Sequence, residues 1–220
     1  MKDIAIIDNY ADLAIGTYLR IVALRRDASL TIYDRQPKEI ALLTGLSEQE
    51  VLALPLPQYK ALAGRLAFLD NSAPDVPRPS KEVRIGDLVL VPVADSAKLT
   101  AAQYIDYQTM LAQDGTEDKV VELLSVFLVP KGKAYCDGYD IADVQTAIRD
   151  HLSVLDVLSL VGFFMTRFAA SIASSLSLSE KMVRRITDPE QRKDLLTRVE
   201  KAREALLSLT AGDGSRASIG

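Results

Sequence analysis

The stretch "LTAAQYIDYQTML" at residues 99–111 predicts a helix and contains the signal for its start. Thr100 can accept a hydrogen bond from a first-turn amide, and Gln103, three residues later, can bond back to the amide of Thr100. A second stretch is "LAIGTYLRIVALR" at 13–25, where Leu13, Tyr18, Leu19 and Ile21 correspond to Leu99, Tyr104, Ile105 and Tyr107. We therefore predict a mainly helical protein in which a similar helix start occurs twice.

The resemblance between the two halves extends beyond these helices. Residues 38–44, "KEIALLT", resemble residues 119–125, "KVVELLS", and the order of the two helices is the same in both halves. One hypothesis is a duplicated helical hairpin, with Tyr18 and Tyr104 at equivalent points and their rings packed inward. The alternative is that any two amphipathic helices share Leu and Tyr at such spacing.

Composition indicates a globular protein and argues against some functions. Apolar residues make up 48% of the 220 residues and charged residues 25%, and the net charge is −4. A mildly acidic chain is a poor candidate for a protein that wraps nucleic acid, because phosphate contacts need clustered Lys and Arg. The single cysteine, Cys136, excludes an intrachain disulfide and a cysteine zinc cluster.

The pattern along the chain predicts a mainly α fold of the α+β class. We expect a bundle of about seven to eight helices with a small β-hairpin near 82–93, where a Gly-Asp turn separates two short apolar runs. The predicted divisions are an N-terminal helical lobe at 1–70, a Pro-rich linker at 71–80, a lobe with the hairpin and the remaining helices at 81–209, and a flexible tail at 210–220.

Several shorter signals refine these helices. We expect an apolar stripe on the first helix, helix starts near Pro37 and Pro57, and capping at Ser47 and Asp140. The stripe comprises Ile15, Tyr18, Leu19, Val22 and Ala23. Pro92 is predicted to lie on an exposed sheet edge. The long apolar helix at 153–178 is predicted to be buried rather than membrane-spanning, because Asp156 and Arg167 leave only a short uncharged run between them.

No pattern of reactive residues points to catalysis. A triad built from His151, Cys136 and an Asp lacks supporting spacing, and the loop "PKGKAYCDGYD" at 130–140 fails the phosphate-loop pattern. We therefore predict that the protein is not an enzyme and that it has no catalytic, cofactor-binding or metal-binding residues.

The candidate binding residues lie in three places. The loop at 130–140 is interpreted either as an exposed docking loop or as a packed connector, and the long apolar helix and the basic C-terminal segment are further candidates. The predicted partner-binding residues are Lys131, Lys133, Tyr135, Tyr139, Phe163 and Phe164. The predicted nucleic-acid-binding residues are Lys181, Arg184, Arg185, Arg192 and Lys193.

Four segments, taken in order, resemble a known group of proteins. They are "IALLTGLSEQEVLALPLPQYKAL" (40–62), "KLTAAQYIDYQTML" (98–111), "ELLSVFLVPKGKAYCDGYD" (122–140) and "VGFFMTRFAASI" (161–172). Their arrangement resembles small proteins encoded among the virion and tail genes of tailed bacteriophages, including the crAss-like phages of gut Bacteroidetes. The resemblance covers about residues 10–175 and brings no catalytic residues with it.

This resemblance implies a non-enzymatic phage protein that acts by protein–protein binding in virion or tail assembly, such as a tail assembly chaperone. Its partners would be other phage structural proteins or a second copy of itself, and it would act in the host cytoplasm or within the virion. The binding surface would be an apolar groove or helix face. The alternatives are a structural, cargo or internal virion component and, less favoured, a nucleic-acid-associated protein that uses the C-terminal basic helix.

Overall fold

The structure is a computed structural model. It describes residues 4–71, 76, 79–93, 95, 98–111, 119–183, 189–190, 193, 195–197 and 200–201, without the side chains of 111 and 168–182. The chain divides into two compact units, one comprising residues 1–92 with 100–161 and the other 93–99 with 162–220. The described residues are mainly helical with one small antiparallel sheet, which confirms the predicted fold class.

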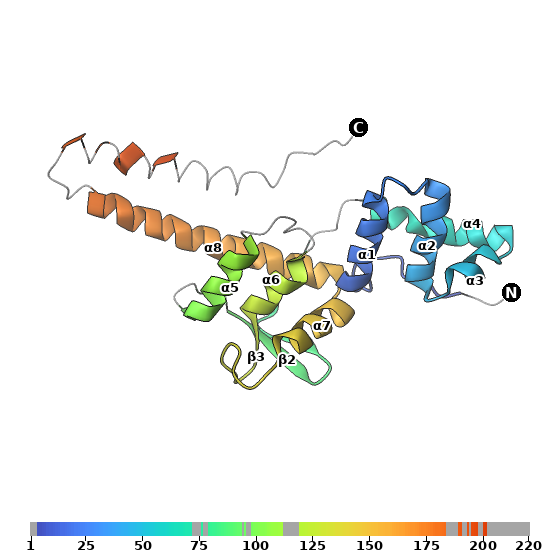
Figure 1. Cartoon of the computed structure of the whole chain (residues 1–220), viewed down its shortest axis with the longest axis horizontal. Helices are drawn as coiled ribbons and strands as arrows, with labels where there is room; N and C mark the ends of the chain where they lie inside the picture. Colours follow the sequence, from blue (N-terminus) through green and yellow to red (C-terminus); the bar gives the residue numbers. More distant parts are fainter. Residues whose placement is uncertain are drawn as a thin grey trace. The chain divides into compact units, whose positions relative to one another are not determined.

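Four α-helices and a 3₁₀ helix form the N-terminal part of the first unit (Figure 1). They are α1 (Ile15–Arg26), α2 (Ile32–Thr44), α3 (Glu48–Leu52), α4 (Leu56–Arg65) and η1 (Leu66–Asp70). The predicted Ser47–Glu50 capping box is present, and Gly45 ends α2 with a φ of 73°. Helix α2 starts earlier than predicted because Thr31 and Asp34 form a capping box of their own. Pro37 therefore lies inside the helix and not in its first turn.

The small sheet contains the predicted hairpin and one further strand. Its strands are β1 (Val83–Ile85), β2 (Leu88–Pro92) and β3 (Leu128–Pro130), all antiparallel in the order β1-β2-β3. The sequence does not predict β3, because Leu128 and Val129 continue the apolar run of the preceding helix. Pro92 pairs with Leu128 at the end of the central strand, so its predicted place on an exposed edge is wrong.

Three helices accompany the sheet in the first unit, namely α5 (Ala101–Leu111), α6 (Val120–Phe127) and α7 (Ile141–His151) (Figure 1). The predicted cap of α5 is confirmed, because Thr100 Oγ1 accepts from Gln103 N at 3.2 Å and Gln103 Oε1 accepts from Thr100 N at 3.0 Å. Gln103 is buried, and its amide donates to the carbonyl of Val126 at 2.8 Å. One residue thus caps α5 and satisfies a carbonyl near the end of α6.

The long apolar helix is α8 (Val154–Val183), and its start is tied to the start of α1. Ile15 N donates to Leu152 O and Val154 N donates to Leu13 O, both at 2.8 Å, which forms an antiparallel bridge between Ala14 and Ser153. Helix α1 has no side-chain cap, so the predicted repeat of the helix start signal at 13–25 is wrong. Backbone from a distant segment satisfies its first amide instead.

Burial separates the two tyrosines that the duplication hypothesis placed at equivalent points. Tyr18 is half-buried, whereas the side chain of Tyr104 lies outside the core with 56% of its surface exposed. The expectation that both rings pack inward is therefore wrong for Tyr104, while the duplication itself stays a prediction. The predicted lobe boundaries also stay predictions, and the predicted tail lies outside the described residues.

The core draws on nearly every element of the first unit. Its largest fully buried apolar side chains are Leu13, Ile21, Ile40, Leu90, Leu128, Ile148 and Leu160. None of the described helices is both long and apolar enough to cross a membrane.

Candidate protein-binding site

The loop at 130–140 is anchored at its start and carries exposed lysines. Lys131 N donates to Val89 O at 2.8 Å, and its ammonium group pairs with Glu82 at 2.7 Å, while the side chain as a whole is 61% exposed. Lys133 is also exposed, and its ammonium lies beside Gly138. Both lysines could contact a partner, so their predicted role stays a prediction.

Tyr135 shows that the loop is in part a packed connector. Its ring is buried, and its hydroxyl donates to Asp106 Oδ2 on α5 at 2.8 Å. Tyr139 is half-buried. The expectation that both rings are exposed for docking is therefore wrong for Tyr135, because packing against α5 removes it from solvent. Burial, followed by the hydrogen bond to Asp106, raises the pKa of the Tyr135 hydroxyl above its usual value.

This raised pKa predicts a loss of stability in alkali. The unfolded chain releases the Tyr135 proton near pH 10 whereas the folded chain retains it, so stability falls as the pH rises above about 10, by up to about 1.4 kcal/mol per pH unit. We expect Tyr135→Phe to flatten this decline between about pH 10 and 11 relative to the unmodified chain. The measurement is urea unfolding at a series of pH values. Tyr33→Phe, at a ring that is 84% exposed, is the control and should leave the slope unchanged.

The two phenylalanines predicted to bind a partner differ in exposure. Phe164 is buried, with only 5% of its surface exposed, whereas Phe163 is half-buried. The rings contact edge to face with centroids 5.5 Å apart, and the guanidinium of Arg167 lies 5.5 Å from the Phe163 ring centroid. Phe164 therefore offers little surface to a partner, and Phe163 offers part of one ring.

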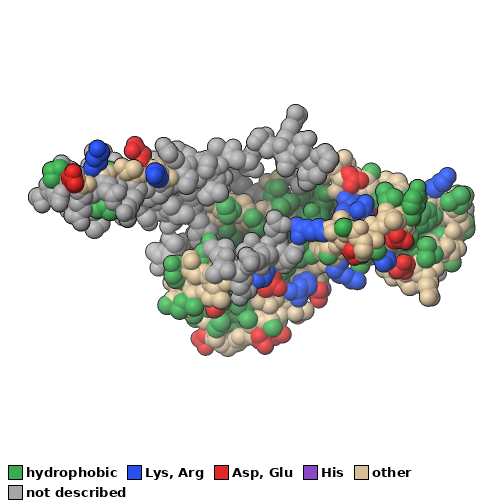
Figure 2. Space-filling model, turned by 45° about the horizontal axis from the view of Figure 1, so that its top comes forward, with side chains coloured by type: hydrophobic (Ala, Val, Ile, Leu, Met, Phe, Trp, Pro, Cys, Tyr) green, Lys and Arg blue, Asp and Glu red, His purple; other side chains and the backbone are tan. Residues whose placement is uncertain are grey.

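The structure describes little of the predicted nucleic-acid-binding positions. Arg184, Arg185, Arg192 and the side chain of Lys181 lie outside the described residues. Lys193 is described and exposed. In Figure 2, basic, acidic and hydrophobic side chains are interspersed over the described part of the face in view.

The residues weighed for a reactive centre are exposed. His151 ends α7, and Cys136 lies in the loop with a positive φ of 57°. Within the described ranges, no group of three or more His, Cys, Asp and Glu side chains is placed to hold a metal ion.

Two open hollows flank α1 and form what we call the α1 groove. One, of about 800 Å³, lies between α1 and the segment formed by α2 and the start of α3. The other, of about 630 Å³, lies between α1 and the end of α7. Arg20 and Ala23 line both hollows. The apolar lining comprises Ala14, Leu19, Ala23, Leu24, Ala41, Leu42 and Leu46.

The charges differ between the two sides of the α1 groove. The hollow beside α2 has two basic residues, Arg20 and Lys38, and two acidic residues, Asp27 and Glu48. The hollow beside α7 has three arginines and one acid, and its charged residues are Arg20, Arg26, Arg149 and Asp150. Arg149 is paired with Glu122 at 3.2 Å, so the groove combines an apolar lining with charged residues of both signs.

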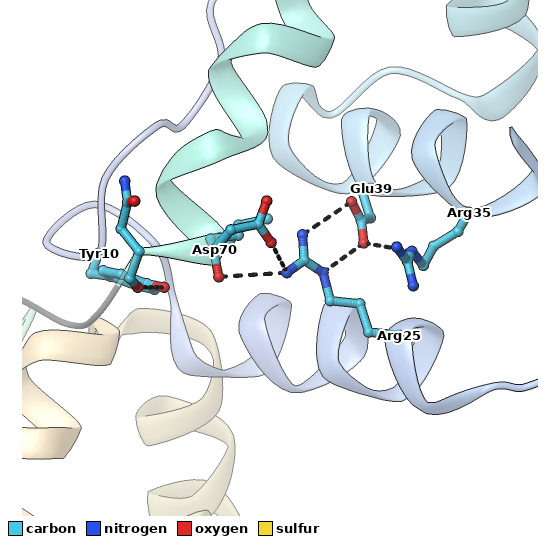
Figure 3. A network of polar contacts seen from close by, with 7 residues as sticks. Tyr10, Arg25, Arg35, Glu39 and Asp70 are labelled. Carbon is cyan, nitrogen blue, oxygen red and sulfur yellow. Dashed lines mark hydrogen bonds and ion pairs between the residues drawn. The ribbon is translucent and has the colours of Figure 1, made fainter. Parts of the chain in front are cut away.

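An ion-pair network links α1 to α2 and to η1 (Figure 3). Arg25 on α1 donates to Glu39 on α2 at 2.8 Å and to Asp70 at the end of η1 at 2.8 Å. Arg35 Nε lies 3.3 Å from the same Glu39 oxygen, and the Glu39 side chain is only 4% exposed. These ion pairs therefore join α1 and α2, the two helices that border the larger hollow.

Tyr10 packs between α1 and η1 through its aromatic ring. Its buried ring packs edge to face on Phe68, with centroids 5.2 Å apart, and on Tyr18, at 6.1 Å. Its hydroxyl donates to the carbonyl of Asn71 at 3.4 Å, and burial raises its pKa. Aromatic pairs of this edge-to-face kind contribute about 0.5 to 1.5 kcal/mol beyond the area they bury.

The sequence pattern did not single out the first helix as a binding surface. Leu19 and Ala23 belong to the apolar stripe predicted for the first helix, yet Ala23 is exposed and Leu19 only half-buried. Helical spacing identified these positions as apolar, but it does not tell which of them the neighbouring helices leave uncovered. A comparison of the chain with protein-family models, curated proteins and solved structures found no match.

Proposed function

We propose that this protein is a non-enzymatic assembly factor that binds another protein in the α1 groove, within the virion or tail assembly of a tailed bacteriophage. The observation that carries the binding function is the partial exposure of apolar α1 positions in two open hollows, one of them beside α2, to which Arg25 ties α1. The phage assignment rests on the ordered sequence segments alone.

The groove has the dimensions of a site for a short amphipathic helix. Helix α1 has 12 residues and is therefore about 18 Å long, which is about three helical turns. A helix presenting small and branched apolar residues at i, i+3, i+4 and i+7 would contact this lining. Such binding would be reversible for a chaperone, and the protein would act in the host cytoplasm.

Site-specific crosslinking tests the proposed surface. We would place a photoreactive benzoylphenylalanine at position 23 and, as the matched control, at exposed Ala67 on η1, which does not line the groove. The full chain would be co-expressed with the genes of its phage and irradiated. We expect position 23, but not position 67, to crosslink to one defined virion or tail protein, identified by mass spectrometry. Equal or no crosslinking at the two positions would contradict a binding role for the groove.

Mass spectrometry of purified virions separates the chaperone from a structural component. A chaperone leaves its client and should be absent, while a structural, cargo or internal component remains and should be abundant. The same crosslink with abundant protein in the virion would therefore favour the structural alternative.

A further inference from the structure

We infer that α8 is a hinged helix, which bends in the turn between Gly162 and Thr166 and so changes the direction of the part of α8 that follows this turn. This inference goes beyond the proposed function, because it concerns a motion of the chain and assigns no partner. Its basis is the position of one glycine, the hydrogen bond of one hydroxyl group and the place where the buried face of α8 ends.

The two compact units of the chain meet inside α8. One unit includes the chain up to Val161 and the other continues from Gly162, although the backbone is helical without interruption over Val154–Val183 (Figure 1). Any change of direction at this boundary is therefore a bend of helical backbone. Sharp bends in helices have local causes, such as proline, glycine next to serine, or a side chain that inserts into the backbone hydrogen bonds.

Gly162 lies at this boundary, and close packing does not explain its presence. A Cβ atom at this position would meet nothing within 4 Å, and the residue is exposed. A helix interior with room for alanine favours alanine over glycine. At Gly16, by contrast, a Cβ atom would lie 2.5 Å from Arg149 Cγ, so packing requires a glycine there. What Gly162 supplies is conformational freedom of the backbone.

The hydroxyl of Thr166 acts on the same turn. Thr166 Oγ1 donates to the carbonyl oxygen of Gly162 at 2.8 Å. In the hydrogen-bonding pattern of an α-helix, that carbonyl also accepts from the amide of Thr166, so two donors share one acceptor. Threonines that bond back to the carbonyl four residues earlier weaken a helix slightly and often bend it. The glycine and the threonine therefore favour bending of one and the same turn.

The exposed side of α8 at this turn is the side on which a bend opens. Gly162, Met165 and Thr166 are neighbours on one face of the helix, and all three are exposed, Met165 by 56%. Before the boundary, Leu160 is only 2% exposed. Helices bend by tilting solvent-side carbonyls toward water, which lengthens their hydrogen bonds. The Gly162 carbonyl lies on that side, so the bend does not require a buried carbonyl to lose its partner.

Distances between pairs of spin labels test the hinge in the full-length protein. Each pair has one label at position 177 of α8, and the second label is at exposed Thr146 of α7 or at exposed Gln108 of α5. Cys136 is replaced by Ser so that only the introduced cysteines react. Position 177 lies about 22 Å beyond Gly162 along a straight helix. A bend of about 30° moves it by about 11 Å, which double electron–electron resonance resolves.

We expect at least one of the two distance distributions to have a width of about 10 Å or more. Gly162→Ala together with Thr166→Val should reduce that width about twofold, because alanine is the better helix former and valine removes the second donor to the Gly162 carbonyl. Thr166→Ser keeps the hydroxyl group and should leave the width unchanged.

Gly64→Ala is the matched control, because Gly64 is also an exposed helical glycine with open space at its Cβ position, but it lies within the first unit. It should leave both distributions unchanged. Two narrow distributions without the substitutions would show that α8 is rigid and would overturn the hinge. It would also be overturned if Gly162→Ala with Thr166→Val changed neither width, or if Gly64→Ala narrowed them equally. The crosslink at position 23 tests the proposed function independently of these outcomes.

Discussion

Glu39→Ala is expected to reduce the free energy of unfolding by about 3 kcal/mol, because it leaves two arginines near a buried site without their carboxylate. The Glu39 side chain is 4% exposed and accepts from Arg25, with Arg35 Nε at 3.3 Å. Both arginine side chains are about one-quarter exposed and can turn partly toward water, which places the effect at the lower end for a broken buried pair. The measurement is urea unfolding followed by circular dichroism at pH 7.

Asp70→Ala is the matched control, because Asp70 binds the same arginine at the same distance of 2.8 Å. Its side chain is 72% exposed, so its loss should cost less than about 1 kcal/mol. The double substitution Arg25→Met with Glu39→Leu should recover part of the loss, because apolar groups of similar size replace the Arg25–Glu39 pair while Arg35 still lacks its carboxylate. A cost for Glu39→Ala no greater than that for Asp70→Ala would show that the network adds little to stability.

Gly16→Ala is expected to destabilise the protein by about 2 kcal/mol by forcing α1 and α7 apart. A Cβ atom at this position would lie 2.5 Å from Arg149 Cγ and 2.7 Å from the Arg149 carbonyl oxygen. The side chain of Arg149 can move, but its backbone oxygen is fixed within α7. Overpacking therefore outweighs the gain in helix propensity of about 1 kcal/mol that alanine brings.

Gly64→Ala provides the opposite case. Gly64 lies in α4, and nothing stands within 4 Å of the position its Cβ would occupy. This substitution should stabilise the protein by about 0.5 to 1 kcal/mol.

Adding Arg149→Ala to Gly16→Ala should not restore stability, since the contact with the backbone oxygen remains. Equal effects of the two glycine substitutions in urea unfolding would contradict the close approach of α1 and α7.

The candidate site was only partly predictable. The sequence indicated that an apolar groove or helix face would bind a partner, and it singled out the loop at 130–140. It could not show that Tyr135 is buried, because that depends on α5 bringing Asp106 to the hydroxyl. It also could not show that Ala23 is exposed, because helical spacing defines an apolar face without specifying how much of that face the neighbouring helices cover.

The sequence by itself determined the features that depend on a few neighbouring residues. The capping boxes at Ser47 and Thr100 and the turn between β1 and β2 were correct because side chain and backbone meet within four residues. Only the tertiary structure decided β3, since Leu128 and Val129 continue the apolar pattern of α6 until β2 pairs with them. It also decided the start of α1, where Leu152, distant in sequence, accepts the hydrogen bond that a local side chain would otherwise accept. Contacts between distant segments leave no fixed spacing in the chain, and the α1 groove is formed by such contacts.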